Sequence, residues 1–225
     1  KSGLTAFPGN AALGRARDPR LAYAVGRQMA LELAPLGVRM NLAPVLDVAT
    51  KDYNPGIGIR SFGADPRLAG RLGAAFIKGL QDHGVSACAK HFPGKGAATV
   101  DAHVDLPTIK LGRTPFLRGH LAPFKAAVAA GADAIMTSHV RFPAFDSLPA
   151  TFSMKIVRDV LRRDLSYDGL VMSDDLCMGA ITKRWPVAEA TLKTLKSGHD
   201  VLMIAHDEQG MRDAVELLRE AAGAG

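Results

Sequence analysis

The chain has 225 residues, of which 48% are hydrophobic and 22% are charged. These are the proportions of an ordinary globular protein, and they exclude a disordered or collagen-like chain. The 28 basic and 22 acidic residues give a net charge of +6, but the basic residues are scattered and form no RNA-binding or zinc-finger motif. We therefore expect no nucleic-acid partner. No apolar run is long enough to predict a membrane-spanning helix.

The ends of the chain and its cysteines bear on domain organisation and location. Lys1 is not a typical first residue of a protein. The sequence after it lacks the charged region and following apolar region that would indicate a signal peptide. The two cysteines, Cys88 and Cys177, cannot form a disulfide framework, so we expect both to be structural. We expect one domain over residues 1–225, belonging to a longer protein, and unpaired thiols favour the cytoplasm.

Hydrophobic periodicity predicts helices and strands in alternation. In chain order we expect a helix at Asp18–Leu36, a strand at Val38–Ala43, a helix at Asp65–His83, a strand at Val85–Ala89, a helix at Pro115–Ala130, a strand at Ala132–Thr137, a helix at Ser153–Asp164, a strand at Gly169–Ser173, a helix at Val187–Gly198, a strand at Asp200–Ala205 and a helix at Glu208–Ala222. Asp-Pro pairs at residues 18–19 and 65–66 indicate capped helix starts, and Gly84 indicates a left-handed helix end.

This alternation predicts an α/β domain with a parallel sheet. Five strands are fewer than a closed eight-stranded barrel needs, and they also fit an open doubly wound sheet, so the pattern leaves both folds open. No glycine-rich dinucleotide-binding motif follows a strand. The segment Gly94-Lys95-Gly96 lacks the Ser or Thr that ends a phosphate-binding loop.

Polar residues gather where the predicted strands end. In order, the five strands are followed by Asp47, by Lys90 and His91, by His139, by Asp174 and Asp175, and by His206 and Asp207. Active sites of α/β barrels lie at this end of the strands, although strand exits are also exposed and polar for simpler reasons. Side chains alternate along a strand, so we expect one of Asp174 and Asp175 to face the site and the other to cap the next helix.

The loop after the second of these strand ends contains Asp101 and His103. An aspartate two positions from a histidine can orient the imidazole as a general acid/base. Two alternatives stay open from the residues alone: a metal site made by this pair with His91, and a simply solvated pair. We expect the other histidines, His83, His120 and His199, to be surface or packing residues.

Several longer motifs occur together in a fixed order. They are Asn41-Leu42-Ala43-Pro44-Val45-Leu46-Asp47-Val48, Ile59-Arg60-Ser61-Phe62-Gly63, Lys90-His91-Phe92-Pro93-Gly94, Asp101-Ala102-His103, Pro149-Ala150-Thr151-Phe152-Ser153 and Val171-Met172-Ser173-Asp174-Asp175-Leu176. In order and spacing the set resembles glycoside hydrolase family 3, and within that family the bacterial β-N-acetylglucosaminidases.

The resemblance implies a (β/α)8 TIM-type barrel that lacks its first strands in this chain. It implies a retaining exo-glycosidase that removes terminal β-linked N-acetylglucosamine, typically from peptidoglycan fragments during cell-wall recycling. Asp174 would be the nucleophile, and His103 would be the acid/base with Asp101 as its partner. Arg60, Lys90 and His91 would bind sugar hydroxyl groups. The resemblance implies a carbohydrate substrate and neither a metal nor a cofactor.

Three positions depart from the family pattern, in which a His follows the Pro-Gly pair and an Asp-Thr pair follows the next Gly. Here they are Lys95, Ala97 and Ala98. We expect these changes to alter how the loop closes or which leaving group it admits. The alternatives are a β-glucosidase or phosphorylase of the same family, and a non-catalytic glycan-binding relic of the barrel.

Overall fold

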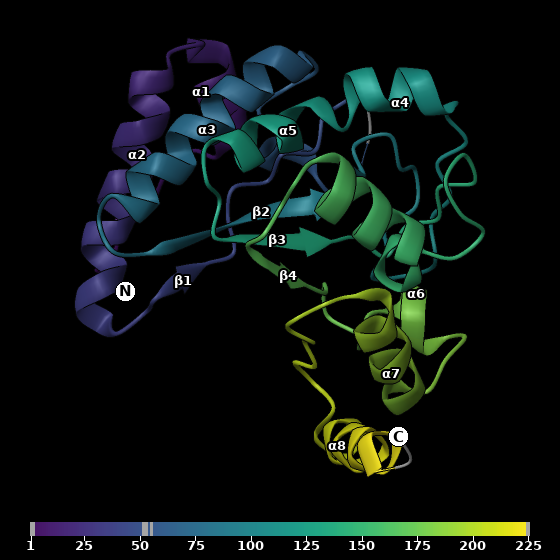
Figure 1. The fold of residues 1–225 in the computed structure, drawn as a ribbon. Coiled ribbons are helices and arrows are strands. Elements are labelled where there is room, and N and C mark those ends of the chain that lie inside the picture. Colours follow the sequence, from purple (N-terminus) through teal and green to yellow (C-terminus); the bar gives the residue numbers. More distant parts are fainter. Residues whose placement is uncertain (1–2, 51–53, 55, 224–225) are drawn as a thin grey trace.

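The computed structural model describes residues 3–50, 54 and 56–223, so Lys1 lies outside the described residues. Four parallel strands form its sheet in the order β1-β2-β3-β4, namely β1 (Met40–Asn41), β2 (Ser86–Phe92), β3 (Ala134–Thr137) and β4 (Leu170–Met172) (Figure 1). Neighbours in sequence are neighbours in the sheet, and helices connect them. This is the βα order of a barrel, and the predicted α/β class is confirmed.

Helices of the first half cover one face of the sheet (Figure 1). They are α1 (Asn10–Ala16), α2 (Pro19–Leu33), the 3-10 turn η1 (Ala34–Leu36), the 3-10 turn η2 (Gly58–Arg60), α3 (Pro66–Gln81), α4 (Arg113–Gly119) and α5 (Ala122–Ala129). The two predicted Asp-Pro starts are confirmed. The carboxylate of Asp18 accepts the N–H of Arg20, and that of Asp65 accepts the N–H groups of Arg67 and Leu68. Gly84 has φ +80°, as its predicted role requires.

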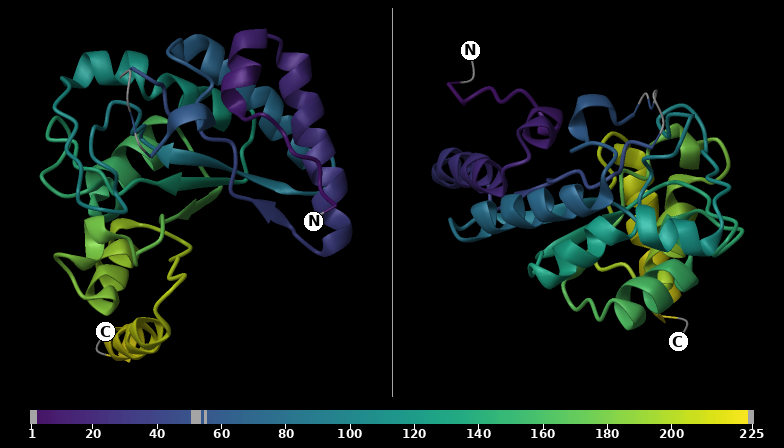
Figure 2. Two further views of the ribbon diagram at one scale, coloured as in Figure 1. Left: turned by 180° about the vertical axis from the view of Figure 1, so that it is seen from behind. Right: turned by 90° about the horizontal axis from the view of Figure 1, so that it is seen from above.

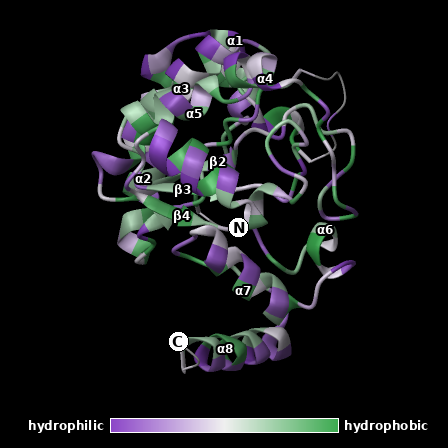
Figure 3. Cartoon of the chain, turned by 45° about the vertical axis from the view of Figure 1, so that its right-hand side comes forward, coloured by the Kyte–Doolittle hydropathy of each residue, from purple (hydrophilic) through white to green (hydrophobic). Residues whose placement is uncertain are grey.

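The second half of the chain forms the helices and turns that follow β3 and β4. Its elements are the 3-10 turn η3 (Ala150–Phe152), the π-helix η4 (Lys155–Asp164), α6 (Gly179–Thr182), α7 (Val187–Ser197) and α8 (Glu208–Gly223). Helix α8 packs beside α7, at the end of the molecule far from α1 and α2 (Figures 1 and 2). Both helices carry polar and apolar bands (Figure 3). None of the described helices combines the length and the hydropathy of a membrane-spanning segment.

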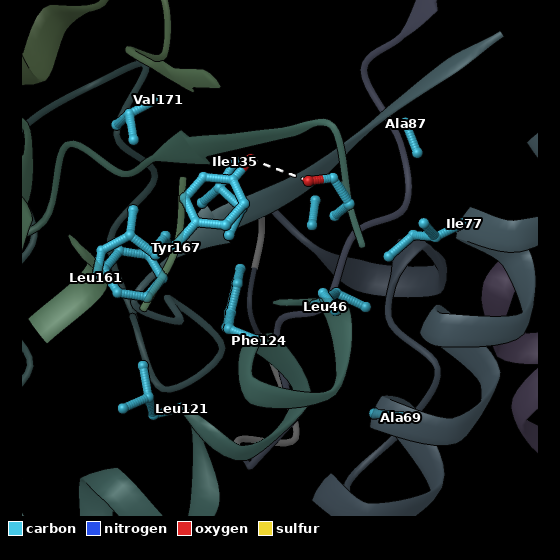
Figure 4. Packing of buried hydrophobic residues seen from close by; sticks show 14 of the residues in the cluster. Leu46, Ala69, Ile77, Ala87, Leu121, Phe124, Ile135, Leu161, Tyr167 and Val171 are labelled. Carbon is cyan, nitrogen blue, oxygen red and sulfur yellow. Dashed lines mark hydrogen bonds between the residues drawn. The ribbon is translucent and has the colours of Figure 1, made fainter. Parts of the chain in front are cut away.

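Side chains of the strands alternate between two cores, as a pleated sheet requires. Ile135 and Val171 point into the larger core, where Phe124, Leu161 and Tyr167 pack from the covering elements (Figure 4). The opposite face has a smaller, sulfur-rich cluster that contains Cys88, Ala134, Met136 and Met172. Both faces of the strands are therefore apolar.

Two predicted elements were wrong. The helix expected at Pro115–Ala130 is two helices, α4 and α5, because Pro123 has no N–H to continue the first helix and instead lies in the first turn of the second. The strand expected at Asp200–Ala205 is reduced to one bridge between Val201 and Met172. There the N–H of Met203 donates to the side-chain oxygen of Ser173 at 3.0 Å, so the backbone ladder does not continue.

The first predicted strand, Val38–Ala43, is only two residues long as β1, and α1 was not predicted. Pro44 follows this strand closely and cannot donate a ladder hydrogen bond. The sheet of the described residues therefore has four regular strands instead of five.

Glycines allow α2 and α3 to approach closely, and the two helices lie side by side in Figure 2. A Cβ atom at Gly79 would lie 2.2 Å from the carbonyl oxygen of Tyr23. We expect Gly79→Ala to lower the free energy of unfolding by about 2 kcal/mol, since overpacking exceeds the gain in helix propensity. Urea denaturation measures this. Gly119→Ala, which adds its methyl group where no atom lies within 4 Å, should cost nothing, and equal losses would contradict the packing argument.

Candidate active site

Strand β2 presents two polar residues toward the end of β4. Its register against β3 shifts between Lys90, which pairs with Met136, and Phe92, which pairs with Thr137, so His91 is the extra residue of a bulge. Bulges redirect side chains at strand ends. As a result, His91 Nε2 lies 3.8 Å from Asp174 Oδ2. Burial lowers the pKa of Lys90, and the nearby Asp174 carboxylate offsets part of this effect.

The carboxylate of Asp47 orients the imidazole ring of His91. The carboxylate is completely buried, and its Oδ2 accepts the Nδ1–H of His91 at 2.7 Å. Burial raises the pKa of the Asp47 carboxyl, but His91 and Lys95 more than offset this and hold it below its usual range. Burial and Lys95 lower the pKa of His91 to about 4, so the ring is neutral near pH 7 and its Nε2 is a hydrogen-bond acceptor.

Asp174 follows β4 and is ionised at neutral pH. Burial raises the pKa of its carboxyl, but His91, His139, Lys95 and the N–H of Asp175 outweigh burial and lower the pKa to about 2. Burial also lowers the pKa of His139, so both imidazoles are neutral near pH 7. Lys95 contributes to the lowered pKa of Asp174 after the two histidines.

Lys95 lies within this site, although in the sequence it is marked only by its departure from the family motif. It is 5% exposed, and its N–H donates to Asp47 Oδ1 at 2.5 Å. Asn54 Nδ2 donates to the carbonyls of both Lys95 and Gly96, at 3.1 and 3.2 Å. A Cβ atom at Gly96 would lie 1.8 Å from the carbonyl oxygen of Val48, so the loop backbone is pressed against the segment after Asp47. The position of Lys95 directly after Pro93-Gly94 is the sequence feature that could have identified it as a site residue.

Asp175 supports the backbone and does not cap the next helix, so that expectation was wrong: α6 begins after Met178 without a side-chain cap. Asp175 Oδ1 accepts the N–H groups of Cys177 and Ala205, at 3.0 and 3.1 Å. Its carbonyl accepts the Nε2–H of the buried His139 at 2.9 Å, and Thr151 bonds the other ring nitrogen at 2.7 Å. These residues hold the loop that carries Asp174.

Asp101 and His103 pair as predicted. Asp101 Oδ1 accepts the Nδ1–H of His103 at 2.7 Å and the backbone N–H of His103 at 3.0 Å. Burial raises the pKa of Asp101, but these hydrogen bonds lower it below its ordinary value. The His103 side chain is 65% exposed, and because Nδ1 is bound to Asp101, Nε2 is the nitrogen that can exchange a proton with a substrate.

Other predicted residues lie elsewhere. Arg60 is exposed, and its Nη1 donates to the Gly56 carbonyl at 2.8 Å, near enough to Lys90 to help lower the pKa of that lysine. His206 is 83% exposed, and Asp207 caps the start of α8 by accepting the N–H of Gly210. Within the described ranges, no three His, Cys, Asp or Glu side chains are arranged to hold a metal ion, so His91 does not join Asp101 and His103.

The remaining three histidines pack as expected. His83 is partly buried, His120 stacks on Phe116, and His199 is buried where it bonds Thr137 and Ser197. Cys88 is buried and Cys177 is partly buried, and both are free thiols.

Together these features define a barrel-type α/β protein with a polar site at the C-terminal ends of its strands. Comparison with known proteins then makes the family clear. The model for the glycosyl hydrolase family 3 N-terminal domain matches residues 1–223, and the chain belongs to this family. Its fold is accordingly part of a TIM-type barrel, and the open doubly wound alternative is wrong.

Named relatives agree with this assignment. A β-hexosaminidase of Thiobacillus denitrificans is 38% identical over 92% of this chain and 59% of its own length. The structure of a family 3 β-N-acetylglucosaminidase from Paenibacillus has 43% identity and a TM-score of 0.97 over 99% of this chain and 43% of that protein. NagZ from Neisseria gonorrhoeae, solved in complex with N-trifluoroacetyl-D-glucosamine, has 33% identity and a TM-score of 0.85 over 97% of this chain and 64% of its own. The chain thus spans about three fifths of the curated relative's length.

Proposed function

We propose that the protein carrying this chain is a retaining β-N-acetylglucosaminidase that acts on terminal residues of peptidoglycan fragments. The observation that carries the proposal is the ionised Asp174 after β4, with His91 3.8 Å away and Lys90 and Lys95 close enough to interact with its charge, together with the Asp101–His103 pair in the loop after β2. The names of the relatives support the sugar specificity. The cytoplasmic location stays a prediction.

In the first step, an oxygen of Asp174 attacks the anomeric carbon while the bond from that carbon to the leaving oxygen breaks. Protonated His103 donates its Nε2 proton to this oxygen, and the negative charge of Asp101 stabilises the imidazolium beforehand. The product is a covalent glycosyl ester of Asp174. Neutral His91, held by Asp47, accepts a hydrogen bond from a sugar hydroxyl, and Lys90 and Arg60 donate to others.

In the second step, neutral His103 takes a proton from water as the water oxygen attacks the anomeric carbon. The ester bond to Asp174 breaks, and the sugar leaves with its original configuration after two inversions. His103 ends this step protonated and Asp174 ionised, so the site returns to its starting state.

The assay of the proposal is release of 4-nitrophenol from its β-N-acetylglucosaminide, compared with release from the β-glucoside. We expect turnover of the first and little of the second. Because a deprotonated histidine is neutral, it repels phosphate less than a carboxylate would, so the assay is run with and without phosphate. N-acetylglucosamine 1-phosphate as product would favour a phosphorylase, and binding of N-acetylglucosamine without turnover would favour the non-catalytic relic.

Lys95→Met is expected to change the pH dependence. The substitution removes a positive charge that lowers the pKa of Asp174, so this pKa rises from about 2. The acid limb of kcat/KM, where the nucleophile becomes protonated, should move to higher pH. Lys193→Met, which removes an exposed lysine paired with Glu189, is the matched control and should leave the profile unchanged. An unmoved limb in Lys95→Met would contradict this role.

A further inference from the structure

The loop of residues 101–106 is attached to helix α6 through its backbone. The N–H of Gly179 donates to the carbonyl of His103 at 3.2 Å, and the N–H of Ala180 donates to that of Ala102 at 2.9 Å. These amides open α6, where N–H groups have no partner inside the helix. The loop carbonyls therefore complete the helix start, and the two segments share their hydrogen bonds.

Side chains attach the same two segments. Ala102 and Leu106 of the loop pack against Met178 and Ala180 in a small apolar cluster that is separate from the main core. At the far side of the loop, Arg184 Nη1 lies 2.6 Å from Asp105 Oδ1. This ion pair is half-exposed and adds little to overall stability, but it restricts sideways movement of the loop relative to α6.

Helix α6 belongs to the segment that begins with Asp174. Asp175 Oδ1 binds the N–H groups of Cys177 and Ala205, so the backbone between Asp174 and Gly179 is held to the segment that contains Ala205. The exposed His103 side chain has its partner, Asp101, on its own loop. The position of His103 relative to Asp174 therefore depends on where α6 holds the loop.

Gly179 is the closest point of this contact. A Cβ atom there would lie 2.5 Å from the carbonyl oxygen of His103 and 2.9 Å from that of Val104. Both are backbone atoms, which cannot move without the loop. Its φ is not in the left-handed range, so alanine suits the helix itself and its methyl group acts on the loop.

We propose that Met178, Gly179, Ala180 and Arg184, here called the α6 anchor, are positioning residues that place His103 for proton transfer to the glycosidic oxygen. The inference rests on the proposed function, because it concerns the acid/base step of that reaction. The anchor acts through the 101–106 loop and does not touch the substrate. In this arrangement, the segment that follows the nucleophile Asp174 positions the acid His103.

The test measures kcat/KM of the intact protein for two β-N-acetylglucosaminides. A 2,4-dinitrophenyl leaving group departs without protonation, whereas a 4-methoxyphenyl leaving group needs the acid. Gly179→Ala and Arg184→Gln should each lose about tenfold or more on the methoxyphenyl substrate and less than about threefold on the dinitrophenyl substrate. A structural defect would lower both values equally.

Gly119→Ala adds a methyl group without a close neighbour, and Arg163→Gln removes two exposed ion pairs on η4, with Asp159 and Asp164, so both serve as matched controls. Equal losses on both substrates, or no loss in Arg184→Gln, would overturn the inference while leaving the proposed function intact. If Gly179→Ala is unstable, Arg184→Gln decides alone, because it changes a partly exposed side chain. An unaltered protein that hydrolyses neither substrate would refute the proposed function itself, and the inference with it.

Discussion

Asp174→Asn is expected to lower kcat for 4-nitrophenyl β-N-acetylglucosaminide by at least about 10⁴-fold. The amide is almost the same size as the carboxylate but is not a nucleophile, so the glycosyl ester does not form. Folding should be little affected, because the carboxylate accepts one backbone hydrogen bond, from Asp175, and an amide oxygen can accept it equally well. Steady-state kinetics and a thermal melt of the same preparation measure the two effects.

Asp175→Ala is the matched control because the two aspartates are adjacent and both side chains are 14% exposed. This change leaves the N–H groups of Cys177 and Ala205 without their acceptor. We expect a loss of about 1–3 kcal/mol in the free energy of unfolding. Retained activity in Asp174→Asn would show that the assignment of the nucleophile is wrong, and unchanged stability in Asp175→Ala would contradict the bonding role of the Asp175 carboxylate.

His103→Ala should have the second largest effect, a loss of about 10²- to 10⁴-fold in hydrolysis of substrates whose leaving group needs protonation. With an activated substrate, the glycosyl enzyme should form and then persist, because no base remains to deprotonate water. Azide attacks without giving up a proton, so adding it should restore turnover and release β-glycosyl azide, which nuclear magnetic resonance identifies.

His206→Ala tests whether loss of any exposed histidine near the site has this effect. His206 Nε2 lies 4.0 Å from Asp175 Oδ2, and the side chain is 83% exposed. Activity and azide response should match those of the unaltered protein. A His103→Ala variant that hydrolyses poor substrates at the normal rate, or ignores azide, would remove His103 from the mechanism.

Local sequence predicts those elements whose determinants are local. The Asp18-Pro19 and Asp65-Pro66 pairs mark real helix starts, because capping involves residues two or three positions apart. The strand expected at Asp200–Ala205 fails for the opposite reason. Whether it pairs depends on the hydroxyl of Ser173, about 30 residues away, which takes the N–H of Met203. Periodicity contains no information about that bond.

The features of the site also divide into those that local sequence predicts and those that depend on distant contacts. Lys90, His91 and Asp174 could be named from motifs, and the structure brings His91 and Asp174 to within 4 Å of each other. The pairing of Asp47 with both His91 and Lys95 spans more than 40 residues and depends on the bulge in β2. Neither feature leaves a short-range pattern. The catalytic roles of Asp174, Asp101 and His103, and sugar binding by Arg60, Lys90 and His91, stay predictions.

The backbone around Lys95 is fixed independently of the Lys95 side chain. Asn54 holds the carbonyls of residues 95 and 96, Asp47 holds the N–H of Lys95, and Gly96 lies tightly against Val48. A different side chain at position 95 therefore leaves its Cα in place and changes only charge and shape. This makes the position suitable for laboratory evolution: a small library of basic and neutral residues there would test how far the charge at position 95 sets the pH range of the proposed activity, without redesign of the barrel.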